Sequence, residues 1–355
     1  MIDLYYYDIY LVFVTLFTII FSANLNNGTR KNAIDDFAII LEIAIILFIG
    51  LRPPYSLFFG DTYNYSKYYG DVFGEPFLSN WEIQDPLFEN TLLLFASLRI
   101  PISLFFLAIA VGYFGLSLSA IRKLFPTQTG LAFLVWLGAF STFSYGVNGL
   151  RAGLAASFFL FAISRRDKLY ILIPAMAASY FIHHSMLVLI VAYVVVLLFK
   201  QIRWFFALWL ISFILAALNI TYFQTLFAGF TDEHGARYLL ANSIDSFVTG
   251  FRIDFILYSA VPIILGYFQF FGKKATSDTY LFLLRLYLLT NSVWLLCVHA
   301  SFTNRIAYLS WFMYPIVLLY PFVNENWGNN HTRYIKYVAY GHLGFTLFMH
   351  IIYYS

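Results

Sequence analysis

Long apolar runs separated by short polar turns dominate the chain from end to end. A helix needs about 20 apolar residues to cross the hydrocarbon core of a bilayer, and fewer where it is short or buried. Twelve segments fit, near residues 5–22, 37–51, 101–120, 130–147, 149–164, 169–182, 184–199, 203–219, 254–271, 279–298, 306–321 and 335–353. The pattern predicts an all-α, polytopic integral membrane protein with about twelve transmembrane helices. The pair around His183 is either two helices or one re-entrant or broken unit.

Composition supports this fold class and narrows the function. Hydrophobic residues make up 61% of the 355 positions and charged residues only 11%, against about 25% charged in soluble domains. We therefore expect residues 1–355 to form a single transmembrane domain. Nucleic acid is not expected as a partner, because the net charge is only +3 and no basic tract is interleaved with exposed aromatics. The single Cys297 excludes an intramolecular disulfide and a cysteine-based metal cage.

Basic residues in the turns orient the segments, because Lys and Arg collect on the cytoplasmic side of a membrane. One set of alternate turns holds Arg30, Lys31, Arg122, Lys123, Arg165, Arg166, Lys168, Lys200, Arg203, Lys273, Lys274, Arg333 and Lys336. The opposite set holds Arg52, Lys67, Arg99, Arg151, Arg237, Arg252 and Arg305. The split of 13 to 7 predicts that both termini and the two long loops, 52–100 and 220–253, lie outside. The first apolar segment, which lacks signal-peptide features, is expected to be retained as a helix.

Four arginines stand at outer ends of apolar segments, against this charge trend. Arg151, in "NGLRAGLA", lies just inside its segment, and Arg52, Arg252 and Arg305 hold similar places in theirs. A cation at the bilayer centre costs several kcal/mol, and near the interface much less. Guanidinium groups bind phosphate through bidentate, charge-assisted bonds, so the four could line an anion site. The alternative is that each one snorkels to lipid phosphates.

A further polar group, in the loop 52–100, is expected on the same outer side as the four arginines. Asp61, Tyr65 and Tyr69 follow one another at four-residue steps, which places them on one face of a helix. A carboxylate with stacked tyrosines suits a sugar, although an interfacial aromatic belt has the same composition.

His183 and His184 stand where two apolar segments meet, level with Arg151. A histidine can act as a general base near neutral pH, and a polar turn between helices is the alternative. No cofactor or metal is expected, because the chain has no H-E-x-x-H, no Cys pair and no Gly-rich phosphate loop. Adjacent histidines would also point to different helix faces.

These motifs resemble the EpsG/Wzy-type family of bacterial repeat-unit polymerases for O-antigen, capsule and exopolysaccharide. The resemblance rests on six short motifs in order along nearly the whole chain: Gly50-x-Arg52, Gly60-Asp61-x3-Tyr65-x3-Tyr69, Asp85-Pro86-Leu87-Phe88, "NGLRAGLA" with Arg151, "HHS" with His183 and Ser185, and "NRIAYL" with Arg305. Asp85 stands where the family often has Glu, and the loop 220–253 matches no motif.

The resemblance implies a helical, GT-C-like glycosyltransferase in the bacterial inner membrane, with its active site facing the periplasm. Donor and acceptor would be undecaprenyl-pyrophosphate-linked oligosaccharides, and the reaction would be inverting and independent of metal. A chain-length regulator is a further partner to consider. We expect His183, Arg151 and Asp61 to be catalytic, with His183 ahead of Asp61 as the base. Arg52, Tyr65, Tyr69, His184, Arg252 and Arg305 are expected to bind substrate.

Three other functions fit a polytopic protein with outer charges. An O-antigen ligase is expected to have a larger late outer loop than the one at 220–253. A lipid-linked oligosaccharide flippase or other transporter places charges along a path through the bilayer midplane, whereas the charges here crowd at one face. A membrane acyltransferase with a histidine base is expected to hold its acyl donor on the cytosolic side.

Overall fold

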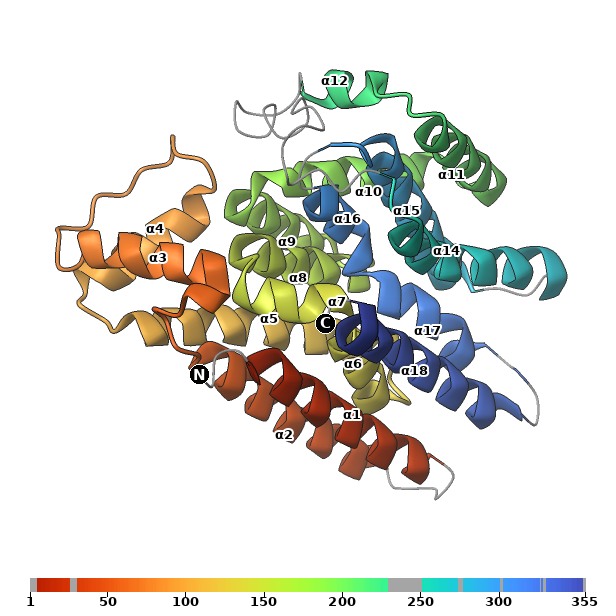
Figure 1. Cartoon of the computed structure of the whole chain (residues 1–355), viewed down its shortest axis with the longest axis horizontal. Helices are drawn as coiled ribbons and strands as arrows, with labels where there is room; N and C mark the ends of the chain where they lie inside the picture. The colour runs from red at the N-terminus through yellow and green to blue at the C-terminus, as the bar shows by residue number, and fades with distance from the viewer. Residues whose placement is uncertain are drawn as a thin grey trace. The chain divides into compact units, whose positions relative to one another are not determined.

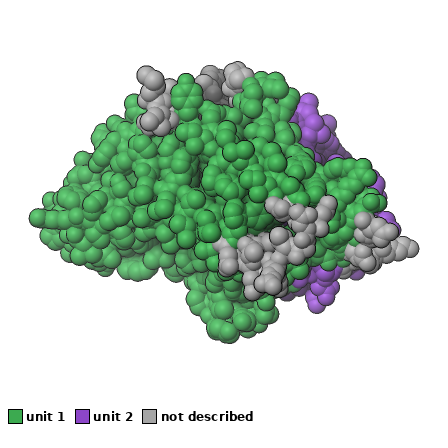
Figure 2. Space-filling model, turned by 90° about the horizontal axis from the view of Figure 1, so that it is seen from below, with its two compact units in different colours: residues 1–187, 322–355 green, residues 188–321 purple. Residues whose placement is uncertain are grey.

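A computed structural model describes residues 5–25, 31–228, 251–273, 277–300, 303–325, 327 and 330–353. These residues form helices and connecting turns, with no strand in the ranges just given. The predicted all-α class is therefore confirmed for the described part of the chain. The chain divides into two compact units: unit 1 comprises residues 1–187 and 322–355, and unit 2 comprises residues 188–321 (Figure 2). That the two form a single transmembrane domain stays a prediction.

Unit 1 begins with two antiparallel helices, α1 and α2, continues through the pair α3 and α4, and ends with the C-terminal helix α18 (Figure 1). Its elements are α1 (Tyr6–Asn24), α2 (Lys31–Gly50), η2 (Leu57–Phe59), α3 (Gly60–Asp71), α4 (Pro86–Ser97), α5 (Ile102–Leu124), α6 (Thr129–Leu137), α7 (Phe140–Val147), α8 (Leu150–Ser164), α9 (Leu169–Ile182), η3 (His184–Met186), α18 (His331–Phe348) and η6 (Met349–Tyr353). The predicted outer loop 52–100 is thus largely the α3–α4 hairpin.

The helices of unit 2 are again mostly apolar. They are α10 (Leu187–Leu198), α11 (Ile202–Ala217), α12 (Tyr222–Ala228), α14 (Ile253–Phe268), η4 (Gln269–Lys273), α15 (Asp278–Leu296), α16 (Thr303–Trp311) and α17 (Tyr314–Asn324). The chain passes between the units at the start of α10 and near the end of α17. Most of the predicted outer loop 220–253 lies outside the described residues.

Five described helices are long and apolar enough to cross a membrane, and a bent pair raises the number to six. The five are Tyr6–Ala23, Ile102–Leu124, Ile253–Gly272, Asp278–Leu296 and Thr303–Asn324. Five shorter apolar helices of 10–17 residues accompany them. The chain is a multi-pass helical membrane protein, and the count of about twelve transmembrane helices stays a prediction.

The structure divides two apolar stretches of the chain into separate helices. The segment 130–147 was expected to be one helix, but it is two, α6 and α7, bent by 73° at Gly138–Ala139. Around His183 the structure has two helices: α9 ends at Ile182 and a short 3-10 turn leads into α10. His183 itself is extended, with φ −156° and ψ 107°. The polar turn therefore breaks the helix where the sequence left two alternatives open.

The core of unit 1 is built around α8, which packs most extensively against α5 and α9. Small residues permit this close approach, as is common between membrane helices. At Gly112 of α5 an added Cβ would lie 2.7 Å from the Leu154 side chain of α8. At Gly153 it would lie 2.7 Å from the carbonyl oxygen of Tyr145 in α7. The Gly153 contact holds the start of α8 against α7 at the elbow between these two helices, and Arg151 lies at this elbow in the first turn of α8.

Candidate active site

Arg52 ties the α3–α4 hairpin to this elbow. It follows α2 directly and is 1% exposed. Its Nε and Nη2 donate to Thr62 Oγ1 at 3.0 and 2.7 Å, and its Nη1 donates to the Ile49 carbonyl at 2.7 Å. The Thr62 hydroxyl in turn donates to the Val147 carbonyl at the end of α7, at 2.6 Å. Burial lowers the pKa of Arg52 to about 9, which leaves it a cation at neutral pH. Arg52 thus links α2, α3 and α7 to one another. Its buried position gives no support to the expected contact with substrate.

We expect Thr62→Val to destabilise the protein by about 1–3 kcal/mol, because the buried Arg52 loses the acceptor of two hydrogen bonds. Valine keeps the shape of the side chain. The measurement is thermal unfolding of the purified protein in detergent. The matched control is Thr91→Val in α4, because the Thr91 hydroxyl bonds the Leu87 carbonyl of its own helix. Equal melting temperatures for the two variants would show that the link through Arg52 contributes nothing.

Asp85 is the residue on which the site converges. It immediately precedes Pro86 and α4 and has left-handed backbone angles, φ 57° and ψ 51°. Asparagine and aspartate enter this region more readily than other residues, at a cost of about 1 kcal/mol. Aspartate is also a favoured N-cap residue, yet its side chain makes no capping hydrogen bond to α4. The carboxylate points away from its own helix and towards α8 and α9.

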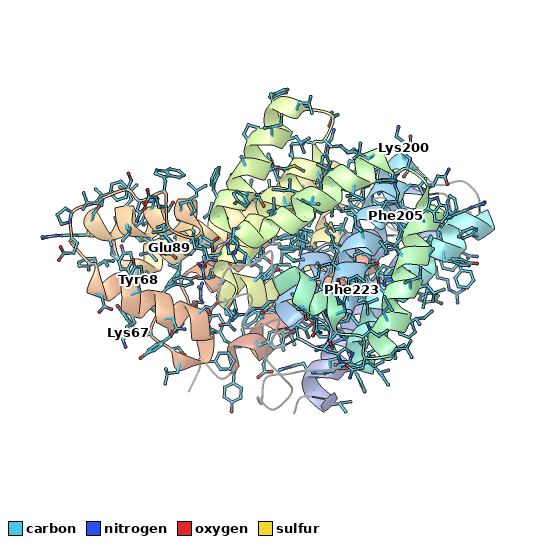
Figure 3. The ribbon with its side chains drawn as sticks, turned by 90° about the horizontal axis from the view of Figure 1, so that it is seen from above. Lys67, Tyr68, Glu89, Lys200, Phe205 and Phe223 are labelled. Atoms are coloured by element: carbon cyan, nitrogen blue, oxygen red, sulfur yellow. The ribbon has the colours of Figure 1, made fainter. Side chains whose placement is uncertain are left out.

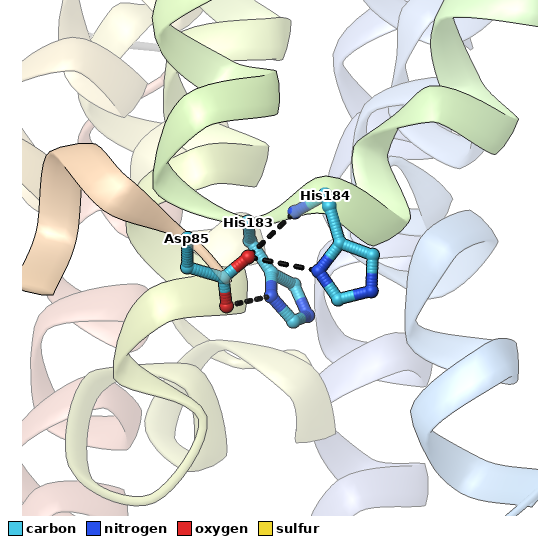
Figure 4. A group of neighbouring side chains, drawn as sticks. All are labelled: Asp85, His183 and His184. Carbon is cyan, nitrogen blue, oxygen red and sulfur yellow. Dashed lines mark hydrogen bonds and ion pairs between the residues drawn. The ribbon is translucent and has the colours of Figure 1, made fainter. Parts of the chain in front are cut away.

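Three side chains from other elements meet this carboxylate, which is 1% exposed. His183 Nδ1 lies 3.0 Å from Oδ2, and His184 approaches Oδ1 through its backbone nitrogen at 2.8 Å and Nδ1 at 2.9 Å (Figure 4). The Nη1 of Arg151 forms an ion pair with Oδ2 at 2.9 Å. Burial opposes ionisation of Asp85, but the hydrogen bonds from the two histidines outweigh it and hold its pKa well below the usual range. Asp85 is therefore an anion.

Arg151 is held at one edge of its guanidinium and is open at the other. Its Nη1 also lies 3.7 Å from the Glu89 carboxylate, and its Cζ lies 5.8 Å from the Tyr65 ring centre. The side chain is 33% exposed. Among the described residues, no hydrogen bond or ion pair involves its Nε or Nη2. Two carboxylates thus keep Arg151 in place while one edge remains for a ligand.

His183 combines the geometry and the charge state of a base. Burial lowers its pKa, while Asp85 raises it and Arg151 and His184 lower it. The net effect favours the neutral imidazole at neutral pH. Its side chain is 22% exposed, and no residue in the described ranges hydrogen-bonds its Nε2. His184 differs, since Gln84 Nε2 lies 3.0 Å from its Nε2.

The hairpin face next to this cluster carries Tyr65, Tyr68 and Glu89. Tyr68 of α3 and Glu89 of α4 are labelled in Figure 3, and burial raises the pKa of both, with Glu89 adding to the shift of Tyr68. For Glu89, Arg151 lowers the pKa and Asp85 raises it. Burial likewise raises the pKa of Tyr65, whose ring packs 5.3 Å from that of Phe88. The hydroxyls of both tyrosines therefore stay protonated.

The predicted helix with Asp61, Tyr65 and Tyr69 on one face exists as α3. Its three members do different things. Asp61 is half-buried in the first turn and interacts electrostatically with Arg151, as Tyr65 does. Tyr69 is 2% exposed and donates its hydroxyl to the Ile100 carbonyl at 2.5 Å. Tyr65 and Asp61 thus adjoin the site, and the position of Tyr69 supports packing.

Two predicted site residues belong to unit 2. Arg252, just before α14, forms an ion pair with Asp254, and its Cζ lies 3.8 Å from the Phe255 ring centre. Arg305 is exposed in the first turn of α16. Their participation in the site, and the expected closeness of Arg305 to Arg151, stay predictions.

Asp85, His183 and His184 have the ligand types of a cation site, and their ligand atoms lie within 4.8 Å of one another. The expectation that the adjacent histidines point to different faces is wrong, because His183 is extended and both rings reach one carboxylate. Each Asp85 oxygen, however, already faces two nitrogen atoms, and one of them belongs to the cation Arg151. These four contacts occupy the acceptor sites of the ionised carboxylate. The expected independence of a metal stays a prediction.

A family model decides where this chain belongs. The model of the EpsG family matches residues 37–355. The chain belongs to the EpsG family. No curated protein and no solved structure matches it significantly.

Membership in the EpsG family confirms the resemblance that the short motifs predicted. The match covers the whole Asp85 cluster. His183 and Arg151 were expected in the site from the sequence, whereas Asp85, Glu89 and Gln84 had no predicted role. The sequence did contain a signal for Asp85. It is the first residue of the Asp-Pro-Leu-Phe motif, and a proline directly after it is typical of the start of a helix. For Glu89 the one-turn spacing from Asp85 was the available signal.

Proposed function

We propose that this EpsG-family protein is a membrane glycosyltransferase that polymerises undecaprenyl-pyrophosphate-linked oligosaccharide repeat units. The single observation that supports this most is the sharing of the Asp85 carboxylate by Arg151 and His183. Glycosyl transfer from a lipid pyrophosphate needs a cation for the leaving group and a base for the acceptor hydroxyl. The cluster offers one of each, and neither is a metal.

In the proposed reaction, the free edge of Arg151 binds the pyrophosphate of the donor. The acceptor hydroxyl gives its proton to Nε2 of His183, and its oxygen attacks the anomeric carbon. The bond from that carbon to the pyrophosphate oxygen breaks, and the pyrophosphate leaves with the bonding electrons. Attack opposite the leaving group inverts the anomeric centre. Asp85 stabilises the imidazolium that forms, and Tyr65 and Asp61 lie where they can contact the sugars.

We place this site on the periplasmic face of the bacterial inner membrane. The basis is the 13 to 7 split of basic residues and the grouping of Arg151, His183 and the α3–α4 hairpin at one end of unit 1. The opposite end of α8 leads to Arg165, which bonds Ser119 near the basic end of α5. Undecaprenyl-linked repeat units would therefore meet the enzyme outside the cytoplasm.

Cysteine labelling tests this orientation. In a Cys297→Ser background, Ser79→Cys should react with an impermeant maleimide added to intact spheroplasts. Lys168→Cys should react only after the membrane is permeabilised. Both side chains are exposed, so access to reagent decides the outcome. The reverse pattern would overturn the orientation and the periplasmic site together.

The function itself is tested with the purified protein in lipid vesicles that contain one lipid-linked repeat unit. A polymerase gives a ladder of products that differ by one repeat. An O-antigen ligase joins the glycan to lipid A core when that acceptor is supplied, and gives no ladder. A flippase moves the lipid between leaflets and leaves it at one repeat. Chelation of divalent cations should leave the ladder unchanged, since no step uses a metal.

A further inference from the structure

Asp85 presents an acceptor-only group to both histidines, and this fixes where their protons lie. An ionised carboxylate has no hydrogen to give, so each Nδ1 that contacts it within 3.0 Å must be the N–H donor. A neutral imidazole with its proton on Nδ1 has its lone pair on Nε2. The carboxylate thus selects the same tautomer in His183 and in His184.

The two histidines then differ in what happens at Nε2. The amide nitrogen of Gln84 lies 3.0 Å from His184 Nε2 and 3.3 Å from Nδ1. Because Nδ1 carries the N–H that Asp85 accepts, the amide hydrogen of Gln84 goes to the lone pair of Nε2. In His183, no residue that the structure describes bonds Nε2, and the side chain is 22% exposed. The same carboxylate therefore leaves one histidine ready to accept a proton and the other one saturated.

Asp85 also connects the base to the cation. Its Oδ2 accepts from His183 Nδ1 and pairs with Arg151 Nη1, so both groups are set relative to one atom. The Asp85 side chain makes no capping hydrogen bond to α4, and its backbone is left-handed. The side chain is therefore directed to His183 and Arg151 and not to its own helix. The charged and titratable groups that face His183 are Asp85, before α4, Arg151 on α8, and His184 on η3.

We propose that Asp85 is a positioning residue that holds His183 with its proton on Nδ1 and its Nε2 directed to the acceptor hydroxyl, at a fixed distance from Arg151. This inference rests on the proposed function for the identity of the acceptor. When the hydroxyl proton moves to Nε2, the imidazolium is stabilised by the Asp85 charge, and its proton later passes to solvent. His184 supports Asp85 through its backbone N–H and its ring, and takes no proton.

The test is Asp85→Asn, which keeps the shape but can no longer require N–H at both rings. Polymerisation should fall by about two to four orders of magnitude. Because Asp85 raises the pKa of His183, the acid limb of the kcat/KM profile should also move to lower pH in the variant. Asp85→Glu, which keeps the charge, should recover part of the rate. A uniform loss at every pH, with the limb unmoved and no recovery by Asp85→Glu, would give Asp85 a merely structural role.

A second readout does not depend on the reaction. In protein labelled with 15N-histidine and assigned with His183→Gln, neutral His183 should carry its proton on Nδ1, and Asp85→Asn should raise the fraction protonated on Nε2. The matched control is Asp71→Asn, an exposed acid at the end of α3, which should change neither the tautomer nor the rate. Nε2–H in the wild type would overturn the inference. If the wild type shows Nδ1–H but forms no polymer, the proposed function fails and the link between Asp85 and His183 stands.

Discussion

Replacing His183 by alanine is expected to lower the polymerisation rate by about two to four orders of magnitude, the usual contribution of a positioned general base. The reason is the environment of Nε2. His183 is neutral because burial lowers its pKa, Asp85 holds its Nδ1 at 3.0 Å, and its Nε2 has no hydrogen-bond partner among the described residues. Rates are measured as the rise of the product ladder with saturating lipid-linked repeat unit, after equal melting temperatures have shown that the variant folds.

The matched control is His184→Ala. It removes a ring whose Nε2 is already bonded to Gln84, while the backbone N–H that donates to Asp85 at 2.8 Å remains. We therefore expect a clearly smaller loss of rate than for His183→Ala. Near-normal polymer from His183→Ala would remove His183 from the role of base. A larger loss for His184→Ala than for His183→Ala would exchange the roles of the two residues.

Arg151→Ala is expected to cost about two to three orders of magnitude in turnover, comparable with the loss of one preorganised donor to a developing negative charge. Arg151→Lys is the sharper experiment. Lysine keeps the charge between Asp85 and Glu89 but loses the planar fork, and with it the second edge that would bind the pyrophosphate. We expect the lysine variant to insert and fold normally, and to be clearly impaired in rate.

Arg165→Lys is the control for this exchange, because Arg165 follows the opposite end of the same helix, where its Nη2 donates to Ser119 at 2.7 Å. It should leave the rate close to wild type. If Arg151 only snorkels to lipid headgroups, lysine serves as well as arginine at both positions. Wild-type polymer length and amount from Arg151→Lys would therefore contradict a pyrophosphate contact.

The apolar helices and the meeting of Arg151 with His183 follow from patterns that the sequence shows directly. Apolar run lengths predict the membrane helices, and the basic residues predict that Arg151 and His183 lie at the same end. The structure brings the two to one carboxylate. Their common depth in the membrane and the number of crossings between them stay predictions.

What the sequence could not show depends on tertiary contacts. Asp85 lies 66 positions from Arg151 and 98 from His183, and its left-handed backbone breaks the periodicity on which helix-face arguments depend. The same applies to His183 and His184, which would diverge on a continuous helix but converge because the chain is extended at His183. The bend at Gly138–Ala139 was missed because both halves of that segment are apolar, so hydropathy continues unbroken across it.

In the proposed function, the Asp85 cluster transfers a glycan from a lipid pyrophosphate to another glycan. The most direct measurement is one time course with purified wild type and His183→Ala in vesicles, in which freed undecaprenyl pyrophosphate and new glycosidic bonds are both counted. The wild type should free one lipid pyrophosphate for each bond that it forms, and the variant should lose both activities together. Lipid pyrophosphate freed without new bonds, or bonds formed by His183→Ala at the wild-type rate, would contradict the proposed function.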